Sequence, residues 1–279
     1  MMGEQSYCVL LLHRARPGCS RRVLQRYFAT EHAAILRRSR DALGYQQYVQ
    51  QHASPDVGLG EVISAGRSWV PVATAAVASC KDIPEPHWAC LDGDASHDVT
   101  EAFHYGSRDA LLEALRHEGS KSELALAVEA RQPWVDRTLA LVGNAYQVAE
   151  DSAPYPRVRL TFCLVRRHGM ARKDMQRYWR EHHGPFVRTL EPKLEYAGYT
   201  QVHADSAEVA DSVALAFGAD SCSTYDGTAS LIYPSEPALR RTFTTLACQQ
   251  ANMALTKDEL NFVDAQRSHL IYGEEVLIA

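Results

Sequence analysis

Two halves of the chain carry the same sequence pattern, and this internal repeat constrains the fold more than any other feature. Residues 7–36 and 158–187 align at a shift of 151 residues, and later blocks, led by Asp98 and Asp226, align at a shift of 128. The matched pairs in the first block include Gly18 and Gly169, Tyr27 and Tyr178, Phe28 and Trp179, and His32 and His183. A repeat of this length indicates two copies of one folding unit in a single chain.

The change of shift indicates an insertion in the first half. Since the shift falls from 151 to 128 residues, about 23 extra residues lie somewhere in 53–97. That stretch contains Ser-Pro, Gly-Leu-Gly and Ile-Pro-Glu-Pro, which favour a long loop over regular structure. We therefore expect two domains, at 1–152 and 153–279, of which the first carries the insertion.

Each half has the same expected order of strands and helices. Both begin with an apolar, β-prone segment and a Gly turn, and the cap-like residues Ser20, Ser107 and Ser235 precede helical stretches. The expected strands lie at 7–14, 44–50, 99–105 and 137–148, and at 158–166, 198–204, 227–233 and 266–278; the expected helices lie at 20–38 and 171–191 and begin again at Ser107 and Ser235. This β-α-β-β-α-β order is that of the ferredoxin-like unit.

One ferredoxin-like unit leaves a face of its sheet uncovered, because both of its helices pack on the other face. Two copies in one chain can cover these bare faces with each other. The expected fold is therefore α+β, with two tandem ferredoxin-like (βαββαβ) units packed sheet to sheet as a pseudo-dimeric α+β barrel. Further pairing of whole chains as a homodimer stays open.

Composition excludes several classes of protein. The 279 residues carry a formal net charge of −5, with 46% hydrophobic and 23% charged residues, which argues against disorder and against a nucleic-acid partner. Apolar runs stay well short of the roughly 18–20 residues of a membrane span, and the first residues lack a basic, signal-like region. We expect no membrane span and a cytoplasmic location.

Motifs for metal and nucleotide chemistry are missing from the sequence. The seven cysteines are scattered and form no CxxC pair, which argues against a zinc knuckle or a disulfide framework. HExxH, GxGxxG, GxxxxGK[ST] and GxSxG do not occur either. We expect no metal and no cofactor. Haem is the alternative, and it would take an axial ligand from His183, His203 or His104.

The segment 166–187, RRHGMARKDMQRYWREHHGPFV, resembles the EthD domain family of the dimeric α+β barrel superfamily. The resemblance rests on Gly169, Tyr178, Trp179, His183, Gly184 and Pro185, and the segment 258–264 resembles the C-terminal region of the family. In the first half Phe28 stands for the Trp and Ala33-Ala34 for Gly-Pro, while Tyr27 and His32 persist. The first half thus resembles a diverged copy.

The resemblance implies a range of functions, because the superfamily includes cofactor-free polyketide cyclases, small monooxygenases, isomerases similar to muconolactone isomerase, and haem proteins. Our leading hypothesis is a cofactor-independent lyase, cyclase or isomerase. It would act on an apolar oxygenated or aromatic small molecule, such as a polyketide-like secondary metabolite, by His-mediated proton transfer. The alternatives are a haem-binding or cofactor-free oxygenase, and a non-catalytic EthD protein that binds a small molecule.

Two histidines are the candidate catalytic residues. Met175, Trp179 and His183 are spaced i, i+4, i+8 and form one stripe of a helix, as do Leu24, Phe28 and His32. Histidine is suited to proton transfer near neutral pH, so His183 is assigned as general acid or base, with His32 in a second pocket. In the alternative interpretation His183 only makes hydrogen bonds at a helix end, since Gly184-Pro185 would stop the helix there.

Aromatic and polar neighbours are the candidate substrate-binding residues. They are Trp179 and Tyr178 beside His183, Tyr199 and His203 on the following strand, and Phe28 and Tyr27 in the first half. Tyr199, Gln201 and His203 share one face of their strand. The corresponding first-half residues are taken as Tyr45, Gln47 and Val49, which would lose the histidine.

Overall fold

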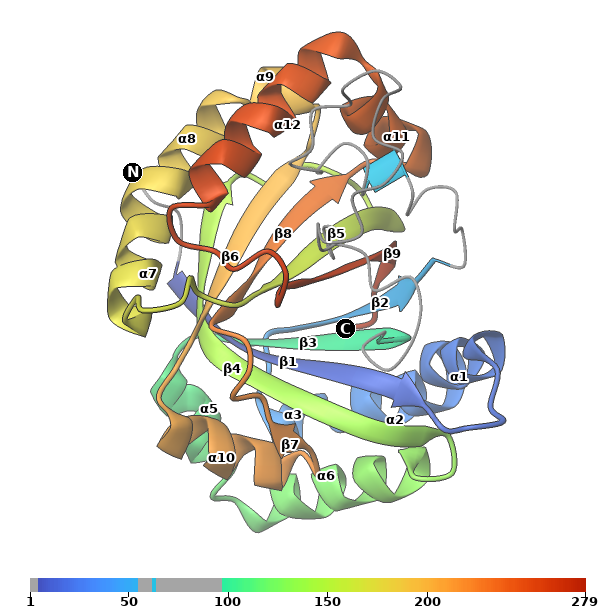
Figure 1. Cartoon of the computed structure of the whole chain (residues 1–279). Helices are drawn as coiled ribbons and strands as arrows, with labels where there is room; N and C mark the ends of the chain where they lie inside the picture. The colour runs from blue at the N-terminus through green and yellow to red at the C-terminus, as the bar shows by residue number, and fades with distance from the viewer. Residues whose placement is uncertain (1–4, 55–61, 64–96) are drawn as a thin grey trace.

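The computed structural model describes residues 5–54, 62–63 and 97–279. Most of the insertion expected at 53–97 therefore lies outside the described residues. Within the described part of the chain, eight of the nine strands hydrogen-bond in a closed ring, since β1 pairs with β4 as well as with β3 (Figure 1). In ring order these strands are β1 (Gln5–Ala15), β3 (Val99–Tyr105), β2 (Gln47–Ala53), β9 (His269–Leu277), β5 (Arg157–Leu164), β8 (Gly227–Tyr233), β6 (Gly198–Ala204) and β4 (Val135–Ala149).

The ring is antiparallel, and the two halves of the chain contribute four neighbouring strands each. The first half gives the order β4-β1-β3-β2, and the second half gives β9-β5-β8-β6, in which the strands have the same relative positions. The halves join through β2–β9 and β4–β6 pairs. The sequence analysis expected two sheets packed face to face, whereas the structure shows the strands of both halves hydrogen-bonded edge to edge in one closed barrel.

Glycines allow the close approach of backbones at both junctions. A Cβ at Gly143 of β4 would overlap the carbonyl oxygen of His203, and a Cβ at Gly273 of β9 would overlap the carbonyl oxygen of His52. Glycine lacks this atom, so neighbouring strands can pair tightly there. A glycine thus allows tight strand pairing at each of the two junctions between the halves.

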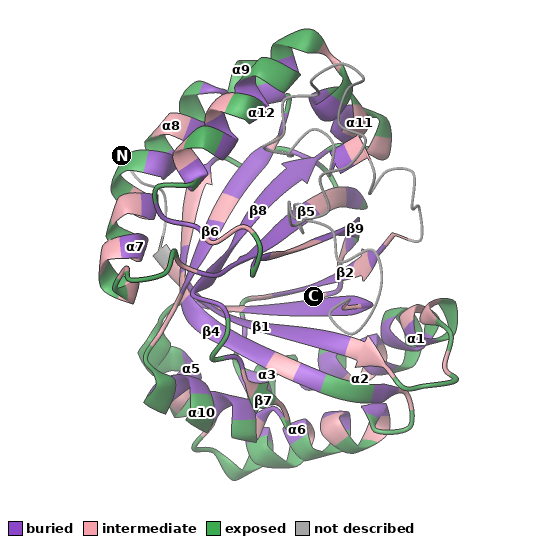
Figure 2. Ribbon diagram, viewed as in Figure 1, coloured by how far each residue is buried: buried purple, intermediate pink, exposed green. Residues whose placement is uncertain are grey.

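Helices cover the barrel on two opposite sides (Figure 1). Figure 2 shows buried residues along the strands and on the inner helix faces, with exposed residues outside. The first-half helical segments are α1 (Arg21–Tyr27), η1 (Phe28–His32), α2 (Ala33–Arg38), α3 (Arg40–Leu43), α5 (Arg108–Ala114) and α6 (Glu118–Arg131). Those of the second half are α7 (Arg172–Tyr178), η2 (Trp179–His183), α8 (Gly184–Thr189), α9 (Glu191–Leu194), α10 (Ala207–Ala216), α11 (Glu236–Thr244) and α12 (Leu246–Glu259).

The helix caps agree with the sequence analysis. The side chains of Ser20, Ser107 and Ser235 each accept a hydrogen bond from the backbone N–H three residues later. The expected stop at Gly184-Pro185 is wrong. Both residues lie in the first turn of α8, where proline is tolerated because that N–H needs no helical partner. A π-helical segment, η2, ends at His183 just before it.

Helix α10 and the short strand β7 (Asp220–Ser221) were not expected. Val209 and Val213 of α10 belong to the apolar core of the first half, beside Val9 and Phe103, and β7 adds a parallel edge to β4. This segment of the second half therefore covers the first half. Among the described residues, no helix is long and apolar enough to cross a membrane.

Candidate active site

The second half brings most of the predicted site residues together between η2, β6 and α12. Trp179, His183 and Tyr199 line a cavity of about 20 Å³, whose other walls are mainly apolar. The remaining lining residues are Phe162, Leu164, Val187, Ala229, Leu231, Leu255, Glu259 and Phe262. A cavity of this size holds about one water molecule.

His183 is held by a carboxylate that the sequence analysis did not assign to the site. Its Nδ1 lies 2.7 Å from Oδ2 of Asp258, and the Tyr178 hydroxyl donates to Oδ1 of the same carboxylate at 2.8 Å. Asp258 lies near the end of α12, 75 residues away along the chain. Since an ionised carboxylate only accepts, Nδ1 of His183 carries the proton and Nε2 is left for other chemistry.

The electrostatics favour an ionised Asp258. Burial raises the pKa of this carboxyl, but the hydrogen bonds from His183 and Tyr178 lower it more, so that the pKa lies below its ordinary value. An oriented histidine beside a fixed anion is an arrangement used for proton transfer. His182, the next residue along the chain, is exposed, as expected.

Trp179, Tyr199, Gln201 and His203 form a second, connected set. The Trp179 indole N–H donates to the Tyr199 hydroxyl at 3.2 Å, and the Gln201 amide donates to that hydroxyl at 3.0 Å. His203 stacks on Trp179 with 4.5 Å between ring centroids, and its Nε2 lies 2.9 Å from Oε1 of Gln201. Burial, with Arg180 adding to it, lowers the pKa of His203 to about 3. This set positions Trp179 and Tyr199, while His203 stays neutral behind the tryptophan.

The first half repeats this set of contacts, three residues further along the chain than the sequence analysis expects. Gln50 donates to the Tyr48 hydroxyl at 2.7 Å, and His52 lies 3.0 Å from the Gln50 Oε1. The assignment of Tyr45, Gln47 and Val49 as counterparts is therefore wrong, because Tyr48, Gln50 and His52 make the matching bonds. Tyr45 instead donates to the Leu36 carbonyl, as Tyr196 does to that of Val187.

His32 lies in a buried polar cluster rather than beside a copy of Asp258. Its Nε2 is 3.1 Å from Oε1 of Glu101, a carboxylate that also contacts Nε2 of His13 at 2.7 Å and the Tyr48 hydroxyl. Phe28 packs between the two imidazoles, with ring centroids 4.8 Å from His13 and 4.7 Å from His32. Tyr27 stacks on Trp134 at 5.3 Å. Both predicted aromatic residues are thus buried walls of this cluster.

Glu101 is the centre of charge in this cluster. Its burial raises the pKa of the carboxyl, but His32 and His13 outweigh burial and bring it well below the ordinary value. Burial lowers the pKa of His13 to about 4, against the pull of Glu101. The position aligned with Glu101 in the second half is Ala229, so the two halves obtain a carboxylate for their histidine from different elements, β3 and α12.

Removing the Glu101 carboxylate is expected to destabilise the protein strongly. In Glu101→Ala, His13, His32 and Tyr48 lose their common partner without access to water, and the free energy of unfolding should fall by about 3–5 kcal/mol. Urea unfolding measures this loss. The matched control is Glu113→Ala, which breaks an exposed pair with Arg116 and should cost about 0–1 kcal/mol. An equal, small effect of both substitutions would contradict the assigned role of Glu101.

The positions of these side chains also bear on metal and haem binding. Among the described residues, no three His, Cys, Asp or Glu side chains converge in a way that could hold a metal ion. His183 and His203 do not fit haem ligation, because the cavity at His183 is about 20 Å³ and His203 is covered by Trp179 and Tyr146. His104 lines the barrel interior instead, and Tyr105 faces the opposite core, as their alternation predicts.

Comparison with known proteins finds a family similarity in the second half. The EthD domain model matches residues 167–266, a segment that contains both His183 and Asp258. The search of curated proteins gave no match. Among solved structures, an anthrone oxidase-like protein superposes with a TM-score of 0.52 at 11% identity, covering 98% of this chain and 92% of its own. A proposed monooxygenase from Lactobacillus acidophilus gives a TM-score of 0.48 at 7% identity, with 99% and 95% covered. At these identities the likeness concerns the fold.

Proposed function

We propose, starting from the EthD-domain match of residues 167–266, that the chain is an enzyme that moves a proton on a small molecule at His183. The observation that carries the proposal is the contact of 2.7 Å between Nδ1 of His183 and Asp258, at the wall of an apolar cavity. Asp258 fixes the tautomer and orientation of the ring. Nε2 then takes a proton from the substrate or returns it, and Asp258 stabilises the imidazolium that forms.

The lining of the cavity supports an apolar or aromatic substrate. Phe162, Leu231 and Phe262 offer hydrocarbon surface, and the Tyr199 hydroxyl offers a polar contact for a carbonyl or phenol oxygen. In this structure the cavity holds about one water molecule, so an organic substrate requires it to widen while His183 and Asp258 stay in contact. Cyclisation, dehydration and isomerisation of a polyketide-like compound all require this kind of proton transfer.

We also infer that the two halves are tandem ferredoxin-like copies that form a pseudo-dimer. Support comes from the shared strand order and from side-chain contacts that recur between positions matched by the internal repeat. Arg21 pairs with Asp98 at 2.7 Å as Arg172 pairs with Asp226 at 2.8 Å. Such matching contacts favour a common origin of the two halves.

An oxygenase is the second candidate function. The name of the anthrone oxidase-like protein favours it, since that protein has the same fold. Removing a proton from an electron-rich aromatic compound at His183 would be the first step of such a reaction as well. The two functions therefore share His183 and differ in whether oxygen enters the product.

The proposed function is tested by metabolite profiling with a matched pair of variants. Purified protein is incubated with a small-molecule extract of the cells that produce it, and mass spectrometry follows which compounds change. We expect a compound that the wild type and His182→Gln convert and that His183→Gln leaves untouched. Equal conversion by His183→Gln would contradict the proposal.

Cofactor independence is a separate part of the proposal and has its own measurement. The purified protein is expected to convert its substrate without a Soret band in its absorption spectrum, and added haemin should not bind stoichiometrically. A Soret band that accompanies activity would replace the cofactor-free form of the proposal by the haem-dependent one.

A further inference from the structure

The interior of the barrel contains a second cavity, separate from the one at His183. Its volume is about 580 Å³, which lies in the range of small-molecule sites. The two cavities lie on opposite faces of β6, because Tyr199 faces His183 while the next residue, Thr200, lines the barrel interior. Gln46, Glu150 and Arg188 line this interior cavity and are exposed, so it is open to solvent at one end.

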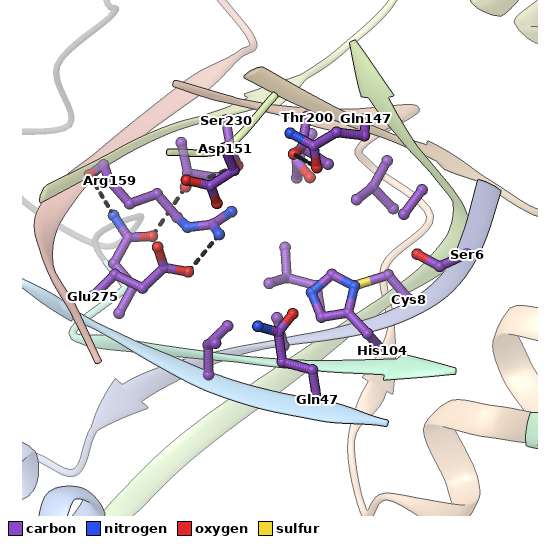
Figure 3. Close-up of a pocket in the computed structure, with 18 of the residues that line it drawn as sticks. Ser6, Cys8, Gln47, His104, Gln147, Asp151, Arg159, Thr200, Ser230 and Glu275 are labelled. Carbon is purple, nitrogen blue, oxygen red and sulfur yellow. Dashed lines mark hydrogen bonds and ion pairs between the residues drawn. The ribbon is translucent and has the colours of Figure 1, made fainter. Parts of the chain in front are cut away.

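The cavity has a charged end and a neutral end (Figure 3). Arg159 and Glu275 form an ion pair at the charged end. By the strand pairing, in which Gly143 takes the position of Gly273, they correspond to Cys8 and Ala145, which also line the cavity. Two copies of one unit would have given a symmetric interior, so the copies have diverged inside the barrel while keeping the strand pairing.

The charges at the charged end balance one another. Arg157 contacts Glu275 at 2.8 Å and Asp151 at 2.7 Å, while Arg159 contacts the other oxygen of Glu275. Two cations thus face two anions. A further buried anion would leave this end with an uncompensated charge, which is costly.

One hydrogen-bond donor at the charged end has no acceptor among the described residues. The Nε–H of Arg159 is buried and has no hydrogen-bond partner among the described residues, and its side chain extends into the cavity (Figure 3). A buried N–H without an acceptor is costly, so a ligand oxygen placed there would be favoured. A neutral oxygen supplies the acceptor without disturbing the charge balance.

The neutral end offers surface without charge. Burial lowers the pKa of His104 to about 4 and raises the pKa of the Cys8 thiol to about 12, so both side chains are uncharged near neutral pH. Leu10, Val49 and Val202 add apolar surface to the cavity. This end therefore suits the hydrocarbon body of a ligand.

We propose that the barrel interior binds a neutral small molecule whose carbonyl oxygen accepts a hydrogen bond from Nε–H of Arg159. The body of the molecule lies towards His104 and Cys8. This site is distinct from the His183 centre and does not depend on catalysis there.

Benzophenone, a neutral aromatic ketone, is a direct probe of the site. On irradiation the ketone abstracts a hydrogen atom from a nearby C–H group, and the two radicals combine, so that a C–C bond joins the resulting alcohol to the residue. Peptide mapping of the irradiated full-length protein should find adducts on interior-facing residues of β1, β2, β3, β4 or β6. Adducts confined to other surfaces would overturn the proposal.

Variants and a charged probe sharpen the test. Arg159→Lys, which removes the Nε–H but keeps the charge, should weaken interior labelling by about tenfold, as for the loss of one hydrogen bond. Ala102→Trp, which fills part of the cavity, should weaken it by leaving less room for the probe. Leu126→Trp, on an exposed helix face, should change nothing. 4-Benzoylbenzoate, which adds a carboxylate, should label the interior less than benzophenone. Unchanged labelling in both cavity variants, or equal labelling by the charged probe, would contradict the proposed site. Circular dichroism confirms that each variant is folded.

Discussion

Replacing His183 by glutamine is expected to lower turnover of the converted compound by about 10²- to 10⁴-fold, the usual contribution of a positioned general acid or base. Glutamine approximates the size of the ring and can still hydrogen-bond to Asp258, so the fold should be retained. Initial rates measured by mass spectrometry, with circular dichroism as a check of folding, give the comparison. A rate within about twofold of wild type would remove His183 from the mechanism.

Asp258→Asn tests whether the carboxylate orients His183. The amide can offer an N–H to Nδ1 of His183 and favour the wrong tautomer, so we expect a large loss of kcat with an intact His183. His182→Gln is the matched control, since His182 is adjacent but exposed. Loss of activity in His182→Gln, or none in Asp258→Asn, would contradict the assigned orientation.

Acid is expected to unfold the protein at a mild pH. Burial lowers the pKa of His52 and His104 to about 4 and that of His203 to about 3, against about 6.5 in an unfolded chain. The unfolded state therefore binds more protons as the pH falls. Stability is fully present above about pH 6.5 and is lost as the pH falls towards 4, by up to about 1.4 kcal/mol per pH unit for each histidine.

Urea unfolding between pH 7 and pH 4.5 measures this dependence. Three such histidines can remove much of a typical stability of about 5–15 kcal/mol. The variant His104→Gln should flatten the curve by one proton, while His182→Gln should leave its slope unchanged. A midpoint that stays constant from pH 7 to pH 5 would contradict the neutral, buried state of these rings.

Local sequence signals predicted the parts of the site that are close in the chain. The spacing of Trp179 and His183 correctly placed both on one helix face, and alternation correctly separated His104 from Tyr105. The partners Asp258 and Glu101 were missed, because α12 and β3 reach the two histidines through tertiary packing. The resemblance of the segment 258–264 to the EthD family was the one signal that could have directed attention to Asp258.

The wrong match of Tyr45 with Tyr199 in the sequence analysis has a physical reason too. Tyr45 and Tyr48 are each followed two residues later by a glutamine, and Gly44 before Tyr45 resembles Gly198 before Tyr199. Gly44 instead adopts a positive φ of 68° that ends α3, whereas Gly198 begins β6 next to Asp151. Backbone conformation, which the residue type alone does not give, decides which glycine matches. The same holds for α10, whose apolar face is explained only by the neighbouring half.

The central claim is that His183 transfers a proton on its substrate, and isotope incorporation tests it most directly. The converted compound is produced in D₂O under ¹⁸O₂ by the wild type and by His183→Gln, and high-resolution mass spectrometry reads both labels. We expect solvent deuterium in the product or in the recovered substrate, dependent on His183 and without ¹⁸O. Incorporation of ¹⁸O from O₂ would favour the oxygenase, and conversion without deuterium that persists in His183→Gln would contradict the claim.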